Sequence, residues 1–342
     1  MKPKPKLTLL AETFNVSVAT VSNALSGKGR ISPDLAQRIR DRAREIGYVP
    51  SSAGRALRTG RSGVLGLVLP DISNPLFPQI AQAIEQAAST CGYGVLIGDA
   101  RGSTEGQSEA INRLLERGVD GMLVIPRRGT RVTDIGRPLA MIDSPSTPGN
   151  TVSADHHDGG VKMGAYLAEL GHRHVLIVAM SSRSIVQADR IEGLKQGLGE
   201  QARVELIFTE DLAEQDGAVG SLGLASYVAR GVTAVATLSD LTALRVLTEL
   251  QGAGLSVPDR VSVTGFDDLI WSSAITPGLT TMRADMAEIG RIVVEALVKS
   301  IERPEQAERT QSGTVKASPD RVAMELLIRA SSGKARHFEV TS

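Results

Sequence analysis

Polar and aromatic side chains follow short apolar runs at intervals along residues 63–275. The residues at these points are Asp71, Asn74, Phe77, Asp143, Arg190, Ser239, Asp240, Asp267 and Trp271. Carboxylates accept hydrogen bonds from hydroxyl groups, an arginine donates them, and aromatic faces cover the apolar side of a sugar ring. If the fold brings these side chains together, their chemistry suits a small polyhydroxyl ligand.

Several of these residues also have a purely structural interpretation. An acidic residue after a strand commonly caps the next helix, and Asp71 and Asp240 would suit that role. Trp271 is the single tryptophan, and it would equally suit core packing. His156 and His157 are interpreted as surface or hinge residues rather than as ligands.

The apolar runs predict strands that alternate with helices. The predicted strands are Val64–Leu69, Gly94–Gly98, Gly121–Ile125, Leu139–Ile142, Thr151–Ala154, His174–Ala179, Val204–Phe208, Ala234–Leu238 and Val261–Gly265. The predicted helices are Pro75–Thr90, Thr104–Arg117, Gly160–Leu170, Ala188–Leu198, Asp216–Arg230 and Leu241–Ala253. This alternation indicates α/β architecture with buried parallel sheets, and its two successive series predict two similar Rossmann-like lobes. Ligands bind beyond the carboxyl ends of such strands, where the polar residues lie.

The first 62 residues form a basic segment in a chain whose net charge is zero. They hold twelve Lys and Arg against four Asp and Glu, a net charge of +8, whereas the other 280 residues hold 26 against 34, a net charge of −8. A basic segment with helical periodicity predicts contact with a nucleic acid. A disordered basic tail would lack that periodicity.

Three helical patterns fill the basic segment. Apolar residues recur at helical spacing over 7–14, a second pattern follows the polar break at 15–17, and a third runs over 33–46 with Ser32 as its predicted N-cap. Two helices with a short turn and a bracing third predict a helix-turn-helix domain, whose second helix enters the major groove of DNA. The residues predicted to reach DNA are Ser17, Val18, Ala19, Thr20, Ser22 and Asn23. Hydroxyls bind phosphates, asparagine pairs with adenine, and small apolar side chains contact thymine methyl groups.

Composition excludes several classes of protein. With 342 residues, 42% of them hydrophobic and 22% charged, the chain is typical of a soluble protein with two or three domains. No apolar run reaches the ~18 residues of a membrane helix, and Glu12 interrupts the first apolar stretch too early for a signal peptide, so we expect a cytoplasmic protein. The single Cys91 excludes an internal disulfide and a cysteine-based zinc site, and no metal or cofactor is predicted. Without a GxGxxG after the first strand, a P-loop or a GxSxG elbow, no catalytic residue is predicted.

Several motifs resemble the lactose-repressor/galactose-repressor family of transcriptional regulators. The segments that carry the resemblance are Ser17–Leu25, Gly47–Pro50, Arg55–Gly60, Asp71–Phe77, Gln187–Gly193, Val263–Asp268, Leu279–Arg283 and Glu325–Ser331. They recur in the family's order and spacing, so the resemblance extends to about residue 332. It implies an all-α helix-turn-helix domain, a hinge helix and two α/β lobes of periplasmic-binding-protein type.

The resemblance also implies domain boundaries. The helix-turn-helix domain would span residues 1–50, the hinge helix 51–61, and the effector-binding and dimerisation domain 62–332, followed by a tail at 333–342. The first lobe would comprise about 62–157 and 286–317, and the second about 158–285 and 318–332. The helix predicted over 285–302 would therefore return to the first lobe.

Individual roles are likewise implied by the resemblance. Val18 and Ala19 would be the main positions of DNA specificity, with Asn23 as a third. Ala53 and Leu57 would contact DNA from the hinge helix, where Leu57 would be a wedge in the minor groove.

In the lobes, Arg190 and Asp267 are the strongest candidates for effector binding by the same resemblance. Leu212 stands where the family often has an aromatic ring, and it is included among the predicted effector-binding residues. The leucine removes a stacking face, so the identity of a bound sugar stays open.

The predicted function is that of a ligand-controlled transcriptional repressor. A homodimer would bind a near-palindromic operator in double-stranded DNA, controlled by a small sugar-like effector between the lobes. No leucine-heptad tail follows, so a dimer is predicted rather than a tail-assembled tetramer. A sugar-binding module of a transport system would share the two-lobed fold, but the basic helix-turn-helix and the missing signal peptide argue against it. An enzyme with a nucleotide-binding α/β fold is the remaining alternative.

Overall fold

The computed structural model describes most of the chain. The described residues are 7–26, 31–48, 60–126, 132, 135–143, 147, 149–211, 220–303 and 320–336. They belong to two compact units, Met1–Ser62 and Gly63–Ser342. Ala53, Leu57 and most of the predicted hinge helix lie outside the described residues, and so does Leu212.

Three short helices form the first unit. They are α1 (Leu7–Phe14), α2 (Val18–Ser26) and α3 (Pro33–Glu45). The hydroxyl of Ser32 accepts a hydrogen bond from the Leu35 amide and caps α3, as predicted. Arg40 of α3 donates from Nη1 to the carbonyl of Ala24 at 3.1 Å, which ties α3 to the end of α2. The apolar faces meet in a small core of Leu10, Ala11, Val21, Ala24, Ala36, Ile39 and Ala43.

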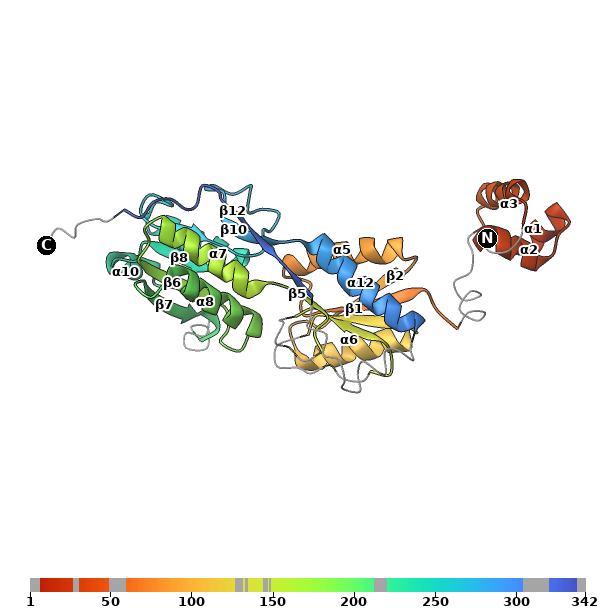
Figure 1. Ribbon diagram of the computed structural model, residues 1–342, viewed down its shortest axis with the longest axis horizontal. Helices are drawn as coiled ribbons and strands as arrows, with labels where there is room; N and C mark the ends of the chain where they lie inside the picture. Colours follow the sequence, from red (N-terminus) through yellow and green to blue (C-terminus); the bar gives the residue numbers. More distant parts are fainter. Residues whose placement is uncertain are drawn as a thin grey trace. The chain divides into compact units, whose positions relative to one another are not determined.

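Two four-stranded parallel sheets form the framework of the second unit (Figure 1). Their orders are β2-β1-β3-β4 and β7-β6-β8-β9. The strands of the first sheet are β1 (Val64–Leu69), β2 (Gly94–Asp99), β3 (Gly121–Val124) and β4 (Leu139–Met141). Those of the second are β6 (His174–Ala179), β7 (Arg203–Phe208), β8 (Ala234–Thr237) and β9 (Ser262–Thr264). The two orders are equivalent, so the prediction of two similar parallel-sheet lobes is confirmed.

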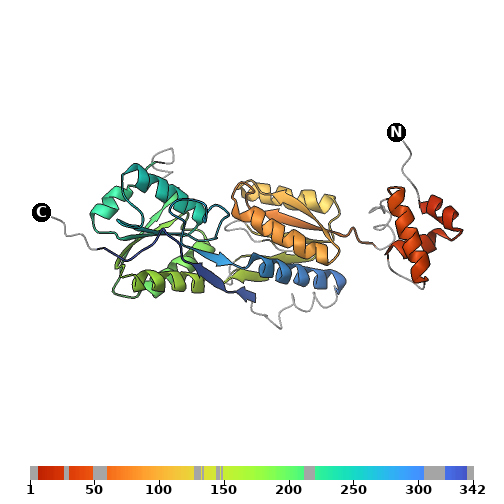
Figure 2. The ribbon, with the colours of Figure 1, turned by 90° about the horizontal axis from the view of Figure 1, so that it is seen from above.

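Helices pack on the sheets of both lobes and bury their apolar residues. They are α5 (Leu76–Thr90), α6 (Thr104–Glu116), α7 (His156–Glu169), α8 (Ile185–Leu198), α10 (Leu224–Ala229), α11 (Asp240–Gly252) and α12 (Met286–Glu302). α12 follows the second lobe in sequence, yet it packs on α5, β3 and β4 of the first, beside which it lies in Figure 2.

Four short strands accompany the passages of the chain between the lobes. β5 (Val152–Ala154) pairs in parallel with β11 (Asp320–Val322), and β10 (Thr281–Ala284) pairs antiparallel with β12 (Met324–Leu327). Segments far apart in sequence therefore lie together where the chain crosses.

The start of α7 differs from the prediction, which placed it at Gly160. The helix begins at His156, because the side chain of Asp155 accepts from the Asp158 amide at 3.1 Å and caps it four residues earlier. Gly160 marks close packing against α8, which lies alongside α7 in Figure 1. A Cβ on Gly160 would lie 2.5 Å from the carbonyl oxygen of Arg190, so only glycine allows this approach.

The helix predicted over Asp216–Arg230 is also shorter than expected. Among its described residues, 220–223 are not helical, and α10 begins at Leu224 after Gly223, whose φ is +69°. Glu249 of α11 explains this start, because its carboxylate accepts hydrogen bonds from the amides of Leu222 and Leu224. A long-range contact thus fixes a turn where the local pattern suggested helix.

Candidate ligand-binding cavity

A cavity of about 340 Å³ opens at the carboxyl ends of both parallel sheets. The residues at strand ends that line it are Pro70, Asp71, Ile125, Pro126, Ile142, Asp143, Met180, Leu238, Ser239 and Asp267. In the first sheet, β1 lies between β2, which follows it in sequence, and β3. In the second sheet, β6 lies in the same way between β7 and β8. Ligand sites of open α/β sheets form at such a reversal of strand order.

The cavity wall combines apolar and polar surfaces. α5 contributes an apolar surface made of Leu76, Phe77 and Ile80. The polar lining residues on the side of the second sheet are His156, at the crossing between the lobes, and Ser184, Gln187, Arg190, Glu210, Ser239 and Asp267 of the second lobe. A ligand here would meet both kinds of surface, which is the usual character of a small-molecule pocket.

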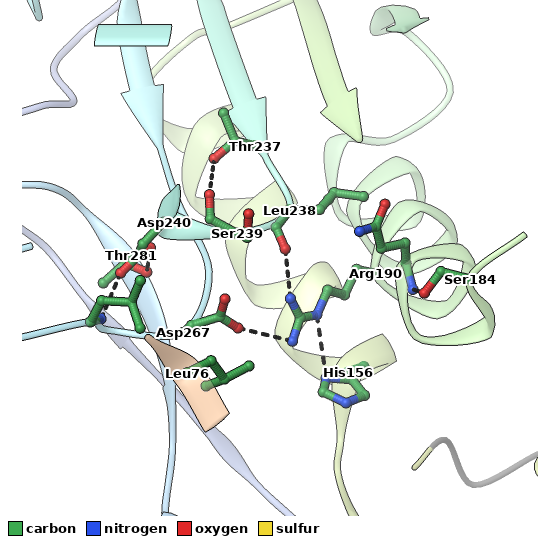
Figure 3. A network of polar contacts seen from close by, with 12 residues as sticks. Leu76, His156, Ser184, Arg190, Thr237, Leu238, Ser239, Asp240, Asp267 and Thr281 are labelled. Atoms are coloured by element: carbon green, nitrogen blue, oxygen red, sulfur yellow. Dashed lines mark hydrogen bonds and ion pairs between the residues drawn. The ribbon is translucent and has the colours of Figure 1, made fainter. Parts of the chain in front are cut away.

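Arg190 is the centre of the polar wall (Figure 3). Its guanidinium donates from Nη1 to the carbonyl of Leu238 at 2.6 Å, from Nη2 to Oδ1 of Asp267 at 3.1 Å, and from Nε to Nδ1 of His156 at 3.4 Å. It also lies 4.3 Å from the centroid of the buried Phe266 ring, in a cation–π contact. The orientation of the guanidinium is therefore fixed by two residues that follow strands, by one residue at the start of a helix, and by the ring of Phe266.

Burial dominates the electrostatics of this wall. Arg190 and Asp267 are both buried, with side-chain exposures of 8% and 7%. Burial raises the pKa of Asp267 to about 7, against the opposing effect of Arg190. Burial and the nearby guanidinium hold the pKa of His156 well below its ordinary value, so this imidazole is neutral near pH 7.

The predicted polar residues of the first lobe also line the cavity, and each is fixed by a local hydrogen bond. Asp71 accepts from the amide and hydroxyl of Ser73, while Asn74 accepts from the amide of Leu76 at the start of α5. Asp143 accepts from the hydroxyl of Thr147 at 2.7 Å. A carboxylate has about four lone-pair sites, so it can accept from several donors at once.

The structure places Asp240 and Trp271 away from the cavity lining. Asp240 is fully buried and accepts hydrogen bonds from the Leu269 amide, the Ser272 hydroxyl and the Thr281 hydroxyl. It therefore fastens the loop after β9 to β10, as Figure 3 shows for Thr281. Trp271 packs against the apolar core beneath α10 and α11.

Ser239 has two roles in the structure. It lines the cavity, and its hydroxyl accepts from the Thr242 amide to cap α11. The helix cap that the sequence suggested at Asp240 therefore belongs to the residue before it.

His156, Gln187 and Phe266 belong to the site although they were not among the predicted ligand-contacting residues. Oε1 of Gln187 accepts from the amides of Met180 and Ser181 and shapes the loop after β6. Gln187 stands in the motif that contains Arg190, which offered a signal for it. Phe266 likewise stands in the motif that contains Asp267, whereas His156 offered no signal, because its relevance depends on its contact with Arg190.

A second cavity, of about 570 Å³, adjoins the first along β10 and β12. Among its charged lining residues, Arg283 donates to Glu325 at 2.6 Å and pairs with Asp268 at 3.8 Å. Asp268 also accepts from Arg329, outside the lining, at 2.7 Å. We attribute this cavity to the crossing segments. Within the described ranges no group of three His, Cys, Asp or Glu is placed to hold a metal ion, and no helix there is long and apolar enough to cross a membrane.

In the first unit, the predicted DNA-contacting residues cluster at the start of α2. Ser17 accepts from the Thr20 amide at 3.0 Å and so caps the helix. Ser17, Val18 and Ala19 are exposed, whereas Thr20, Ser22 and Asn23 are half-buried. Val18, a large apolar residue at the start of the helix, has 42% of its surface exposed.

Comparisons with known proteins match both units. Residues 10–51 match the family "Bacterial regulatory proteins, lacI family", and residues 165–331 match the family "Periplasmic binding protein-like domain". The chain is 30% identical over 286 residues to the HTH-type transcriptional repressor CytR of Escherichia coli, covering 81% of this chain and 84% of the relative.

Two further similarities extend over most of the chain. The ribose operon repressor of Halalkalibacterium halodurans is 27% identical over 299 residues, which cover 86% of this chain and 89% of the relative. The crystal structure of the lac repressor dimer bound to operator and the anti-inducer ONPF has a TM-score of 0.71 and 22% identity, covering 97% of this chain and 100% of that chain. The fold expected from the sequence is therefore confirmed over nearly its whole length.

Proposed function

The chain belongs to the lacI family of bacterial regulatory proteins, and we propose that its ligand-binding cavity is the effector site of a transcriptional repressor. One observation supports this most directly. Arg190 and Asp267 meet at the carboxyl ends of the second sheet, inside a cavity whose other wall belongs to the first lobe. A chain that carries such a site together with a basic three-helix unit has the parts of an effector-controlled DNA-binding protein.

The effector we propose is a small sugar or sugar derivative. The donors of Arg190 and the carboxylates of Asp71, Asp143 and Asp267 suit hydroxyl groups, and Phe77 offers a ring to an apolar sugar face. Relatives support the class: one is named as a ribose operon repressor, and the structure of another lacI-family regulator, from Enterococcus faecium, contains bound ribose.

The DNA partner we propose is a near-palindromic operator bound in the cytoplasm by a homodimer. The exposed start of α2 would read base edges in the major groove, with Val18 and Ala19 as the main specificity positions. Two such helices in a dimer would contact half-sites one helical turn apart. Leu57, in the proposed hinge segment 51–61, would wedge into the minor groove between the half-sites.

Control would follow from unequal affinity of the effector for two arrangements of the lobes. An effector that touches both walls of the cavity favours one spacing of the lobes, and the segments entering the first lobe respond to that spacing. Coupling between two such sites is typically about 1–3 kcal/mol, or roughly 5–150-fold in DNA affinity. We propose no catalytic step.

The test begins with the purified full-length chain. Selection of bound duplexes from a random DNA pool should enrich a near-palindrome, and that duplex then serves to screen sugars for a change in binding. Arg190→Ala should still bind the duplex and should not respond to the sugar found. Arg203→Ala, an exposed arginine of the same lobe, should respond normally. A normal response of Arg190→Ala would contradict the assigned site.

A further inference from the structure

His156 stands at a junction between the two lobes. It is the first residue of α7 and directly follows the short segment after β5, which pairs with β11. It also lines the ligand-binding cavity. The imidazole is therefore placed between a crossing of the chain and the polar wall of the site.

The hydrogen bond from Arg190 decides how the imidazole is protonated. A guanidinium keeps its Nε proton at all relevant pH values, so Nε of Arg190 is the donor and Nδ1 of His156 is the acceptor, at 3.4 Å. An acceptor Nδ1 carries no proton, and a neutral imidazole then has its proton on Nε2.

The charged groups around His156 favour the same state. Arg190 of α8 faces Nδ1, and its positive charge opposes protonation of the ring. Asp267, beyond Arg190, is paired with that guanidinium. On the element of His156 itself, Asp155 accepts from the amide of Asp158, and the carboxylate of Asp158 is paired with Lys162 at 2.6 Å.

Nε2 thus remains as a neutral donor. It lies on the side of the ring away from Arg190 (Figure 3), and within the described residues it makes no hydrogen bond. Arg190 has already committed three of its five N–H groups to Leu238, Asp267 and His156. At this wall, two guanidinium N–H groups and the Nε2–H of His156 therefore have no partner among the described residues.

Resting on the proposed effector site, we propose that His156 is an effector-specificity residue, whose Nε2–H donates to an acceptor oxygen of the effector while Arg190 holds Nδ1. The chemical class recognised is an uncharged oxygen with a free lone pair, such as a hydroxyl, a ring ether or a carbonyl. A sugar with hydrogen in place of that oxygen would cover this donor without giving it a partner, which disfavours its binding.

The protonation state is measured first, in the full-length chain without ligand. Nitrogen-15 NMR of the chain labelled at histidine covers five residues, and the signal of His156 is the one lost in His156→Asn. We expect an unprotonated Nδ1 and a protonated Nε2 from pH 5.5 to 8. A proton on Nδ1, or a charged ring in this range, overturns the proposal.

Two substitutions then separate effector contact from support of Arg190. Asparagine at 156 places an acceptor near the position of Nδ1 and has no donor near Nε2, whereas glutamine places an amide donor near Nε2 and loses the acceptor. If His156 contacts the effector, His156→Asn lowers the affinity for the effector found in the release screen at least tenfold. His156→Gln then lowers that affinity less. If His156 only supports Arg190, the order is reversed, and that result overturns the proposal.

His157→Asn is the matched control, because it makes the same change one residue along the chain, outside the cavity lining. Its affinity for the effector should equal that of the parent chain. If no sugar or sugar derivative alters operator binding at all, the proposed function fails, and the role of His156 fails with it. A reversed order of the two variants, with a normal response of the parent, rejects the role of His156 alone.

Discussion

Asp267→Asn tests whether the carboxylate at the centre of the cavity is buried at a cost in stability. In an unfolded chain an aspartate has a pKa of about 3.9. In the folded chain burial raises the pKa of Asp267 to about 7. The folded state therefore binds the proton more tightly than the unfolded state between these values, and stability falls as pH rises through this window.

The size of the effect follows from the two pKa values. A difference of about three units corresponds to about 4 kcal/mol once both states are ionised. Between pH 5 and pH 8 the loss is about 2.5 kcal/mol, because part of it has already occurred below pH 5. Asparagine has nearly the same shape, does not ionise, and tolerates the positive φ of 115° at this position. The unfolding free energy of Asp267→Asn should therefore rise by about 2.5 kcal/mol relative to that of the parent chain as the pH rises from 5 to 8.

The assay is urea unfolding at pH 5, 6, 7 and 8, followed by the fluorescence of Trp271, the single tryptophan, which packs in the same lobe. A weaker hydrogen bond from Arg190 to the asparagine amide lowers the unfolding free energy of the variant by the same amount at every pH. It therefore leaves the dependence of unfolding free energy on pH unaffected. The dependence on urea should be equal for the two chains, as a control that both expose the same surface. Stability curves that stay parallel from pH 5 to pH 8 would refute the reasoning.

Two further predictions concern packing and the DNA-binding unit. Gly193→Ala should cost about 3 kcal/mol in unfolding free energy, because its Cβ would lie 2.0 Å from a backbone carbonyl oxygen of α7. Gly252→Ala in α11 is the control, because a Cβ there would have nothing within 4 Å. It should gain about 0.5 kcal/mol in the same urea assay. Equal effects would contradict the close contact of α7 and α8. Ser17→Ala should destabilise the first unit by about 1 kcal/mol through loss of the α2 cap and should weaken operator binding, while Ser32→Ala removes the α3 cap and should leave operator binding nearly intact. Calorimetric unfolding and DNA titration distinguish the two serines, and identical DNA affinities would refute the role given to the start of α2.

The architecture could be predicted from sequence because it depends on local patterns that repeat. Continuous apolar strands alternating with helices allow few arrangements, and the carboxyl ends of parallel strands gather at one edge. For this reason the sequence alone predicts Asp71, Asp143 and Asp267 at one site.

The parts that sequence did not predict depend on contacts between distant residues. Asp240 follows a strand just as Asp267 does, yet it is surrounded by the Ser272 and Thr281 hydroxyls and is fully buried. No local pattern distinguishes these two aspartates. Gly160 is a second example, because the sequence predicted that a helix begins there. This glycine instead lies inside α7, where close packing against α8 requires it.

The partners of Arg190 suggest how a small ligand could act on the chain without a long pathway. Asp267 donates its amide to the carbonyl of Met282 in β10, at 2.8 Å, and β10 leads directly into α12 of the first lobe. His156 follows Asp155, whose amide donates to Val322 of β11 at 2.8 Å. Two of the three groups that hold the guanidinium are therefore attached to segments where the chain passes between lobes. A ligand that rearranges this network acts on those crossings through direct contacts, so coupling requires only that the effector bind one geometry of the crossings better than another.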